Sequence, residues 1–177
     1  MAKTAEKKTL WQASRRNFLR DRNIGHAGEV RIKNHMAHYR NVTEVRDIST
    51  SKRGIADDID FEIVYDDGHV STLEVKTDLM AHETGNLVYE ELSNNNPGCF
   101  ARTKADHIAY MLEATGETYI LHPERFRSLI AEIKENKDKA AELGIRATRM
   151  GQGAYGYLIP ISSMLKTDVV ECTIKVA

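Results

Sequence analysis

The stretch Asp57–Asp78, DDIDFEIVYDDGHVSTLEVKTD, contains two segments in which apolar and polar residues alternate. In the first segment Phe61 and Ile63 alternate with acidic residues, and in the second Leu73 and Val75 alternate with polar ones. An alternation with period two is typical of a strand with one buried face. Because the DDG sequence between the segments suits a tight turn, the stretch predicts a β-hairpin.

The length of the turn decides which side chains share a face. A two-residue loop would send the carboxylates of the two strands to opposite sides of the sheet. A three-residue loop, with Gly68 left-handed as a bulge, places Phe61 opposite Leu73 and Asp60 opposite Glu74. Residues opposite each other lie within roughly 5.5 Å at Cβ, so Asp60 and Glu74 could hold one divalent cation between them. We therefore predict the three-residue loop.

The same register places Asp58 opposite Lys76, so Asp58 competes with Asp60 as the acidic residue of this face. The structural alternative is an exposed sheet face, on which Asp58 and Lys76 form a surface ion pair worth roughly 0–1 kcal/mol. A calcium-binding EF-hand loop is excluded, because Ile63 stands where that loop requires glycine.

Charged residues are distributed unevenly along the 177 residues, although the net charge is only −1. Residues 1–40 contain 10 Lys and Arg against 3 Asp and Glu, whereas residues 41–100 contain 4 against 13. A basic segment beside an acidic block suits a protein that grips a polyanion with one part and holds metal cations with another. A solvated basic helix beside an acidic loop region is the alternative. Cys99 and Cys172 lack zinc-site or disulfide-framework spacing, so we expect both to be reduced.

Two helices are predicted before the hairpin. The first covers residues 5–22 and is basic nearly all round, which suits a DNA-contacting arm or a dimer-packing helix. Its basic residues are Lys7, Lys8, Arg15, Arg16, Arg20 and Arg22. The pattern is interrupted at Asn23–Gly28. The second helix extends from about His26 to Tyr39 and places Glu29 on its apolar stripe, where a carboxylate needs a cation, a partner or solvent. An exposed Glu29 at the helix N-terminus is the equal alternative.

Strands and helices alternate after the hairpin within one predicted domain. Before the hairpin we predict a short strand at Val42–Arg46 and a polar turn at SKRG, residues 51–54. After the hairpin we predict a strand at Asn86–Leu92, a helix from Thr103 to Gly116, a strand at Thr118–Leu121, a helix from Pro123 and a final strand at Val169–Val176. Thr103 and Asp106 would form a capping box for the first of these helices. GQGAYG, from Gly151 to Gly156, precedes a strand instead of following one, so we interpret it as a loop and not a nucleotide fingerprint.

Asp60 followed 14 residues later by Glu74-Val75-Lys76 resembles the D…(D/E)xK signature of the PD-(D/E)XK nuclease superfamily. The spacing is similar to that of archaeal Holliday-junction resolvases and of small nucleases of phages and bacteria. Ile59 stands where the family name has proline. The resemblance covers roughly residues 25–121 and implies an α/β fold with a restriction endonuclease-like αβββαβ core, in which helices flank a mixed central sheet. The basic arm (1–23) would precede this core, and a helix and strands (122–177) would follow it.

The resemblance also implies roles for individual residues. Asp60, Glu74 and the carbonyl group of Val75 would bind Mg²⁺, with Mn²⁺ as a substitute. Lys76 would orient or help deprotonate the attacking water and stabilise developing charge. Glu29 stands where many members carry an additional acidic residue, and would position a second ion. The accessory candidates are Asp58, Glu90 and Lys104.

We therefore expect a Mg²⁺-dependent endodeoxyribonuclease that acts on structured or non-specific DNA, with RNA left open and a homodimer implied by the resemblance. One alternative is a nucleic-acid-binding protein of the same fold without catalysis, and another is an exonuclease or a nuclease subunit of a larger complex. No apolar run is long enough to span a bilayer, and the N-terminus lacks the apolar core of a signal peptide. We expect a cytoplasmic protein without a membrane partner, which would act in the host cytoplasm if a phage encodes it.

Overall fold

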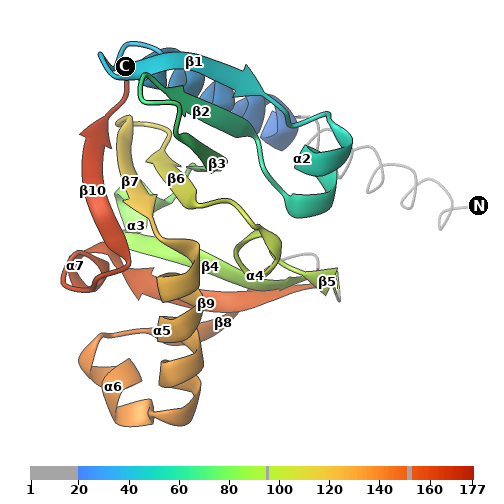
Figure 1. Cartoon of the computed structure of the whole chain (residues 1–177). Helices are drawn as coiled ribbons and strands as arrows, with labels where there is room; N and C mark the ends of the chain where they lie inside the picture. Colours follow the sequence, from blue (N-terminus) through green and yellow to red (C-terminus); the bar gives the residue numbers. More distant parts are fainter. Residues whose placement is uncertain (1–19, 95, 151–152) are drawn as a thin grey trace, which may run out of the picture.

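The computed structural model describes residues 20–94, 96–150 and 153–177, which form two β-sheets with helices around them (Figure 1). In the first sheet the strand order is β1-β2-β3-β6-β7-β10, and only the β3–β6 pair is parallel. Its strands are β1 (Val42–Asp47), β2 (Phe61–Tyr65), β3 (Val70–Asp78), β6 (His107–Leu112), β7 (Glu117–Leu121) and β10 (Val170–Lys175). The second sheet is antiparallel, in the order β5-β4-β9-β8. Its strands are β4 (Asn86–Ser93), β5 (Asn96–Pro97), β8 (Arg146–Met150) and β9 (Ala154–Pro160).

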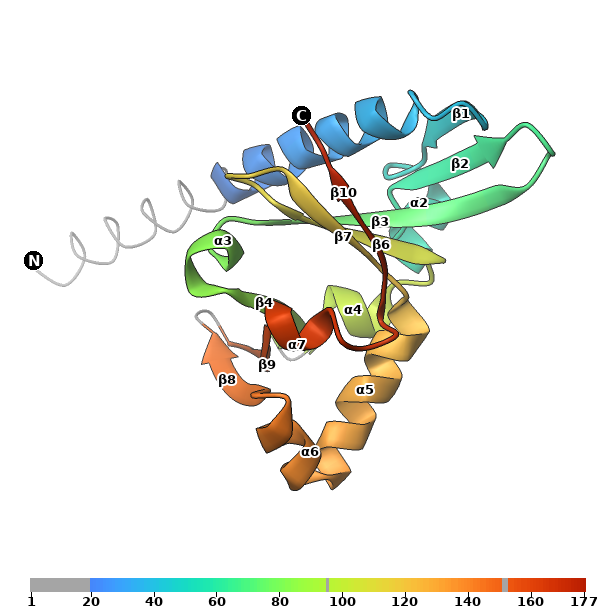
Figure 2. The ribbon, with the colours of Figure 1, turned by 90° about the vertical axis from the view of Figure 1, so that its left-hand side faces the viewer.

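Helices lie on both sides of the first sheet (Figure 2). The N-terminal helix, residues 20–36, lies along one face, whereas α5 and the second sheet lie on the other. The labelled helices are α2 (Lys52–Asp57), α3 (Ala81–Thr84), α4 (Cys99–Arg102), α5 (Pro123–Glu135), α6 (Lys137–Glu142) and α7 (Ile161–Met164). The predicted α/β fold with a mixed central sheet flanked by helices is therefore confirmed. Among the helices of the described ranges, none has the length and apolarity needed to cross a membrane.

Two hydrophobic clusters hold these layers together. Ile32 of the N-terminal helix packs with Phe61, Leu73 and Met111 of the first sheet. On the opposite face, aromatic residues from β4, α4, β6 and α5 pack together, and the ring centroids of Tyr89, Phe100 and Phe126 lie 4.9–5.3 Å apart. Since adjacent residues of a strand point to opposite faces, Leu73 and Val75 contact the helix side while Glu74 and Lys76 share the other.

The β2–β3 hairpin has the predicted register. Phe61 pairs with Leu73, and the backbone N–H of Tyr65 donates to the carbonyl oxygen of His69 at 2.8 Å. Gly68 is left-handed with φ of 85°, and its N–H donates to the carbonyl oxygen of Tyr65 at 3.0 Å. These contacts define the three-residue loop with a glycine bulge, so the prediction of the turn is confirmed. The predictions of β1, β7, α5 and β10 are also confirmed.

The segment before β2 was predicted wrongly. Residues 52–57 form α2 and not a polar turn, and Asp58 ends this helix with a left-handed backbone, φ 56° and ψ 61°. The helix fits here because Gly54 lies against the carbonyl oxygen of Ile48, where a Cβ atom would stand 2.0 Å away. β2 therefore begins only at Phe61, and Asp58 does not pair with Lys76 across the hairpin.

The predicted helix from Thr103 is also wrong, because residues 107–112 form the central strand β6. Five of its six residues are buried, so its apolar residues fit the stripe of a helix as well as a strand buried on both faces. The proposed capping box makes other contacts. Asp106 accepts hydrogen bonds from the backbone N–H and the hydroxyl group of Thr72, at 2.8 and 2.7 Å, and so ties β6 to β3.

Two further predictions need correction. The strand predicted at Asn86–Leu92 exists as β4, but it pairs with β9 in the second sheet and not with the hairpin. The break predicted at Asn23–Gly28 is absent, because residues 20–36 form a continuous helix. Gly28 lies against β3 in this helix, where a Cβ atom would stand 2.0 Å from Oγ1 of Thr77. Residues 1–19 of the predicted basic arm and the start of GQGAYG lie outside the described residues.

Candidate active site

The predicted acidic residues meet where β2 begins beside the middle of β3. Asp60 immediately precedes β2, and its backbone N–H donates to the carbonyl oxygen of Leu73 at 3.0 Å. Its Oδ2 atom accepts a hydrogen bond of 2.8 Å from the backbone N–H of Val75. This contact fixes the Asp60 carboxylate beside Glu74, the residue that precedes Val75. The structure therefore brings Asp60 and Glu74 together, as the hairpin register predicted.

The two carboxyl groups repel each other in a poorly solvated place. Burial raises the pKa of Glu74 to about 10, and the charges of Asp60 and Asp58 act in the same direction against the weaker opposing effects of Lys76 and Arg102. Burial likewise raises the pKa of Asp60 to about 6, although the hydrogen bond from Val75 opposes the rise. Without a bound cation, the site therefore holds a proton on Glu74 at neutral pH.

Lys76 lies on the same face, two residues after Glu74. Its pKa is raised by Cys99, and then by the carboxylates of Glu90, Asp78 and Glu74, against an opposing effect of burial. Burial also raises the pKa of the Cys99 thiol to about 12, so this group is uncharged at neutral pH, as Glu74 is, and the carboxylates of Glu90 and Asp78 favour the charged form of Lys76. Lys76 is therefore an ammonium group at neutral pH, which suits stabilisation of negative charge better than removal of a proton.

Asp58 and Asp57 connect α2 to the end of α4 and to the two residues that follow it. The Oδ1 atom of Asp58 accepts a hydrogen bond of 2.6 Å from Arg102, and its backbone carbonyl accepts one of 2.7 Å from the hydroxyl group of Thr103. Lys104 binds the Asp57 carboxylate at 2.6 Å. The accessory candidate Lys104 is thus engaged at an exposed rim, whereas Asp58 faces the acidic residues and raises the pKa of Glu74.

Glu29 approaches the site from the other side of the sheet. Its side chain is 29% exposed and lies 3.3 Å from Nδ1 of His26, and its charge contributes to the raised pKa of Asp60. Glu29 is therefore neither fully exposed nor bare in the core. The remaining accessory candidate, Glu90 of β4, acts on Lys76 across the space between the two sheets. Arg20 and Arg22 are exposed on the N-terminal helix, and Lys7, Lys8, Arg15 and Arg16 lie outside the described residues.

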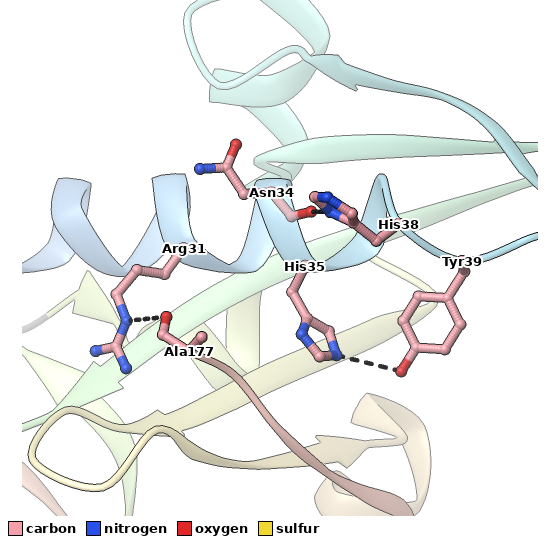
Figure 3. A pocket seen from close by; sticks show the side chains of 6 residues that line it. All are labelled: Arg31, Asn34, His35, His38, Tyr39 and Ala177. Carbon is pink, nitrogen blue, oxygen red and sulfur yellow. Dashed lines mark hydrogen bonds between the residues drawn. The ribbon is translucent and has the colours of Figure 1, made fainter.

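A separate hollow of about 520 Å³ lies on the other flank of the N-terminal helix (Figure 3). Arg31 donates to the backbone oxygen of Ala177 at 3.0 Å there, and the hydroxyl group of Tyr39 lies 3.4 Å from Nε2 of His35. None of the predicted catalytic residues lines this hollow. Arg31 also donates to the carbonyl oxygen of Val176, so it joins the helix to the last strand.

The donor groups near Asp60 fit a hard divalent cation. Mg²⁺ is bound in proteins by one or two carboxylates and keeps several waters, which the pair Asp60 and Glu74 with the Val75 carbonyl could provide. The Oδ2 atom of Asp58 is buried and has no hydrogen-bond partner in the described part of the chain, so only the Oδ1 atom of this carboxylate is paired, with Arg102. No three His, Cys, Asp or Glu side chains of the described ranges are already gathered as a ligand group.

Sequence reasoning missed Arg102 and Asp57. Arg102 contacts Asp58 across 44 residues, and it lies directly before the helix predicted from Thr103, which does not form. A basic residue near an acidic cluster gives no periodic signal, so only the fold brings the two together.

A scan against protein-family models and searches of curated proteins and of solved structures gave no match for this chain.

Proposed function

We propose that the protein is a metal-dependent deoxyribonuclease that hydrolyses phosphodiester bonds within DNA. The observation that carries this proposal is geometric. Asp60 is fixed by the backbone N–H of Val75 beside Glu74, and Lys76 follows on the same face of β3. Two carboxylates and an ammonium group in this arrangement are the parts that metal-assisted hydrolysis of a phosphodiester requires.

The chain order of the elements supports the proposal. The N-terminal helix, β1, β2 and β3 are followed by α4 and by β6, which runs parallel to β3. This order matches the αβββαβ order of the restriction endonuclease-like core when α2, α3, β4 and β5 are treated as insertions. Asp60 then directly precedes the second strand, Glu74 lies on the third strand, and Glu29 lies on the first helix.

Each residue has a defined task in the proposed reaction. A divalent cation bound at Asp60 and Glu74 would lower the pKa of its water and neutralise phosphate charge. The backbone N–H of Val75 keeps the Asp60 carboxylate oriented, and the ammonium group of Lys76 stabilises the negative charge that develops on the phosphate. Glu29 adds negative charge near Asp60 and so strengthens the attraction for cations.

The test uses supercoiled plasmid, end-labelled linear duplex and a four-way DNA junction, each incubated with the purified protein in Mg²⁺, Mn²⁺ or EDTA. We expect cleavage in both metals and none in EDTA, and the form of the plasmid product separates internal cleavage from digestion at ends. Asp60→Asn and Lys76→Met should each reduce cleavage at least about 100-fold. DNA binding without cleavage on all three substrates would favour the non-catalytic binding protein instead.

A further inference from the structure

Arg102 places a positive charge on the acidic residues from outside the hairpin. It is the last residue of α4, and its Nη2 atom lies 2.6 Å from Oδ1 of Asp58. The Arg102 side chain is 53% exposed, whereas that of Asp58 is 19% exposed. The charge of Arg102 also opposes the rise in the pKa of Glu74. Arg102 thus acts as a counter-ion whose side chain has open space on one side.

Asp58 does not depend on Arg102 for its position. Its left-handed backbone is held by a hydrogen bond from its own N–H to the carbonyl oxygen of Gly54, and by the bond from the Thr103 hydroxyl group to its carbonyl oxygen. Its second carboxylate oxygen, Oδ2, is buried and finds no hydrogen-bond donor among the described residues. The carboxylate is therefore fixed in place and only half satisfied, so a stronger cation could displace the guanidinium group.

The charges at the site favour such a displacement when a substrate is present. Asp58, Asp60 and Glu74 provide three negative charges when ionised, and Lys76 and Arg102 provide two positive ones. A divalent cation changes the sum of these five charges from −1 to +1 and so favours the approach of an anionic phosphodiester, an effect that the negative charge of Glu29 near Asp60 reduces. A guanidinium group released from Asp58 would find in that phosphate the planar pair of oxygens that it binds best.

We propose that Arg102 is a further catalytic residue, held by Asp58 in the metal-free protein and transferred to the oxygens of the scissile phosphate when a divalent cation takes over Asp58. This inference rests on the proposed nuclease function. It makes Asp58 a ligand that the cation and Arg102 compete for. It also gives a reason why the half-exposed Arg102 is paired with Asp58, which lies near Glu74, and not with a carboxylate at the exposed rim of the site.

The test is a calorimetric titration of Mg²⁺ and Mn²⁺ into DNA-free protein, together with plasmid cleavage. Arg102→Ala should bind the cation about twofold to tenfold more tightly, because a competitor worth the energy of a partly exposed ion pair is gone. The same variant should cleave about 100-fold more slowly, because the phosphate loses its guanidinium partner. Arg53→Ala, which removes an arginine of α2 paired with Glu62, is the matched control and should leave cation affinity unchanged.

The direction in which Arg102→Ala changes the affinity for the cation tests the proposed role of Arg102. Weaker or unchanged cation binding in Arg102→Ala, or unimpaired cleavage, would overturn the role of Arg102, and Arg102→Gln should repeat the result if the alanine variant folds poorly. Failure of the nuclease proposal looks different. In that case, wild type would bind no cation, or Asp60→Asn would bind as tightly as wild type.

Discussion

At the scale of single residues, burial at the candidate site opposes ionisation of its carboxyl groups. Glu74 ionises only at a pKa of about 10 in the metal-free protein, whereas Glu62 on the neighbouring strand is already paired with Arg53 and Arg46. An unpaired buried carboxyl group costs stability when it ionises. The fold therefore keeps Glu74 in surroundings that destabilise its ionised form, and a bound cation would relieve this destabilisation. Such an arrangement is expected of a cation-binding site and not of a structural ion pair.

The raised pKa of Glu74 predicts how stability depends on pH. The folded protein holds a proton on Glu74 that the unfolded chain releases above about pH 4.5, so without metal the free energy of unfolding should fall as pH rises from about 5 to 10. The slope from this group is at most about 1.4 kcal/mol per pH unit. Urea denaturation in EDTA measures it. Glu74→Gln should flatten the slope, whereas Glu62→Gln should keep it, and equal slopes in all three proteins would refute the assignment.

At the scale of elements, the hairpin and α2 differ in how far the sequence determines them. The alternation in β2 and β3 and the DDG turn are local signals, so register and turn type were predicted correctly. α2 was missed because its formation depends on the close contact between Gly54 and the carbonyl oxygen of Ile48. β6 was missed because burial on both faces removes the alternation that marks a strand. The placement of Asp60, Glu74 and Lys76 on one face was therefore predicted, whereas the pairing of Asp58 with Arg102 was not.

Two glycine substitutions separate the contributions of these elements. Gly68→Ala should cost about 1–2 kcal/mol of stability because of its left-handed backbone alone, since nothing lies within 4 Å of the added Cβ atom.

Gly54→Ala should shift α2, because its Cβ atom would meet the backbone of Ile48. This shift should also weaken cation binding at Asp58. Thermal denaturation and calorimetry check both. Equal cation affinity in the two variants would show that α2 does not position the site.

At the scale of the whole molecule, the two sheets are joined close to the site. Tyr110 of β6 donates its hydroxyl proton to Asp78 of β3 and accepts a hydrogen bond of 3.0 Å from the backbone N–H of Val88 in β4. Tyr110 is fully buried. This one side chain thus connects the end of β3, two residues beyond Lys76, to the second sheet. The distance in sequence between these partners explains why the second sheet was not predicted.

Tyr110→Phe should destabilise the joint between the sheets by about 1–3 kcal/mol, because it leaves the part-buried backbone N–H of Val88 and the Oδ2 atom of Asp78 without the tyrosine hydroxyl group. Tyr119→Phe is the matched control, since that buried tyrosine donates to Glu117 on its own strand at 2.7 Å. Hydrogen exchange should show faster exchange of the Val88 amide only in Tyr110→Phe. Protection at Val88 that survives this substitution would argue against the hydroxyl group as the link.

The proposed function requires Glu74 to hold a cation that drives cleavage of DNA, so Mg²⁺-dependent relaxation of supercoiled plasmid by two variants of one hairpin tests it. Glu62→Gln should relax the plasmid within a few-fold of the wild-type rate, because Arg53 and Arg46 already neutralise its carboxylate. Glu74→Gln should lose at least about 100-fold. Equal rates in the two variants, or relaxation that persists in EDTA, would contradict the account.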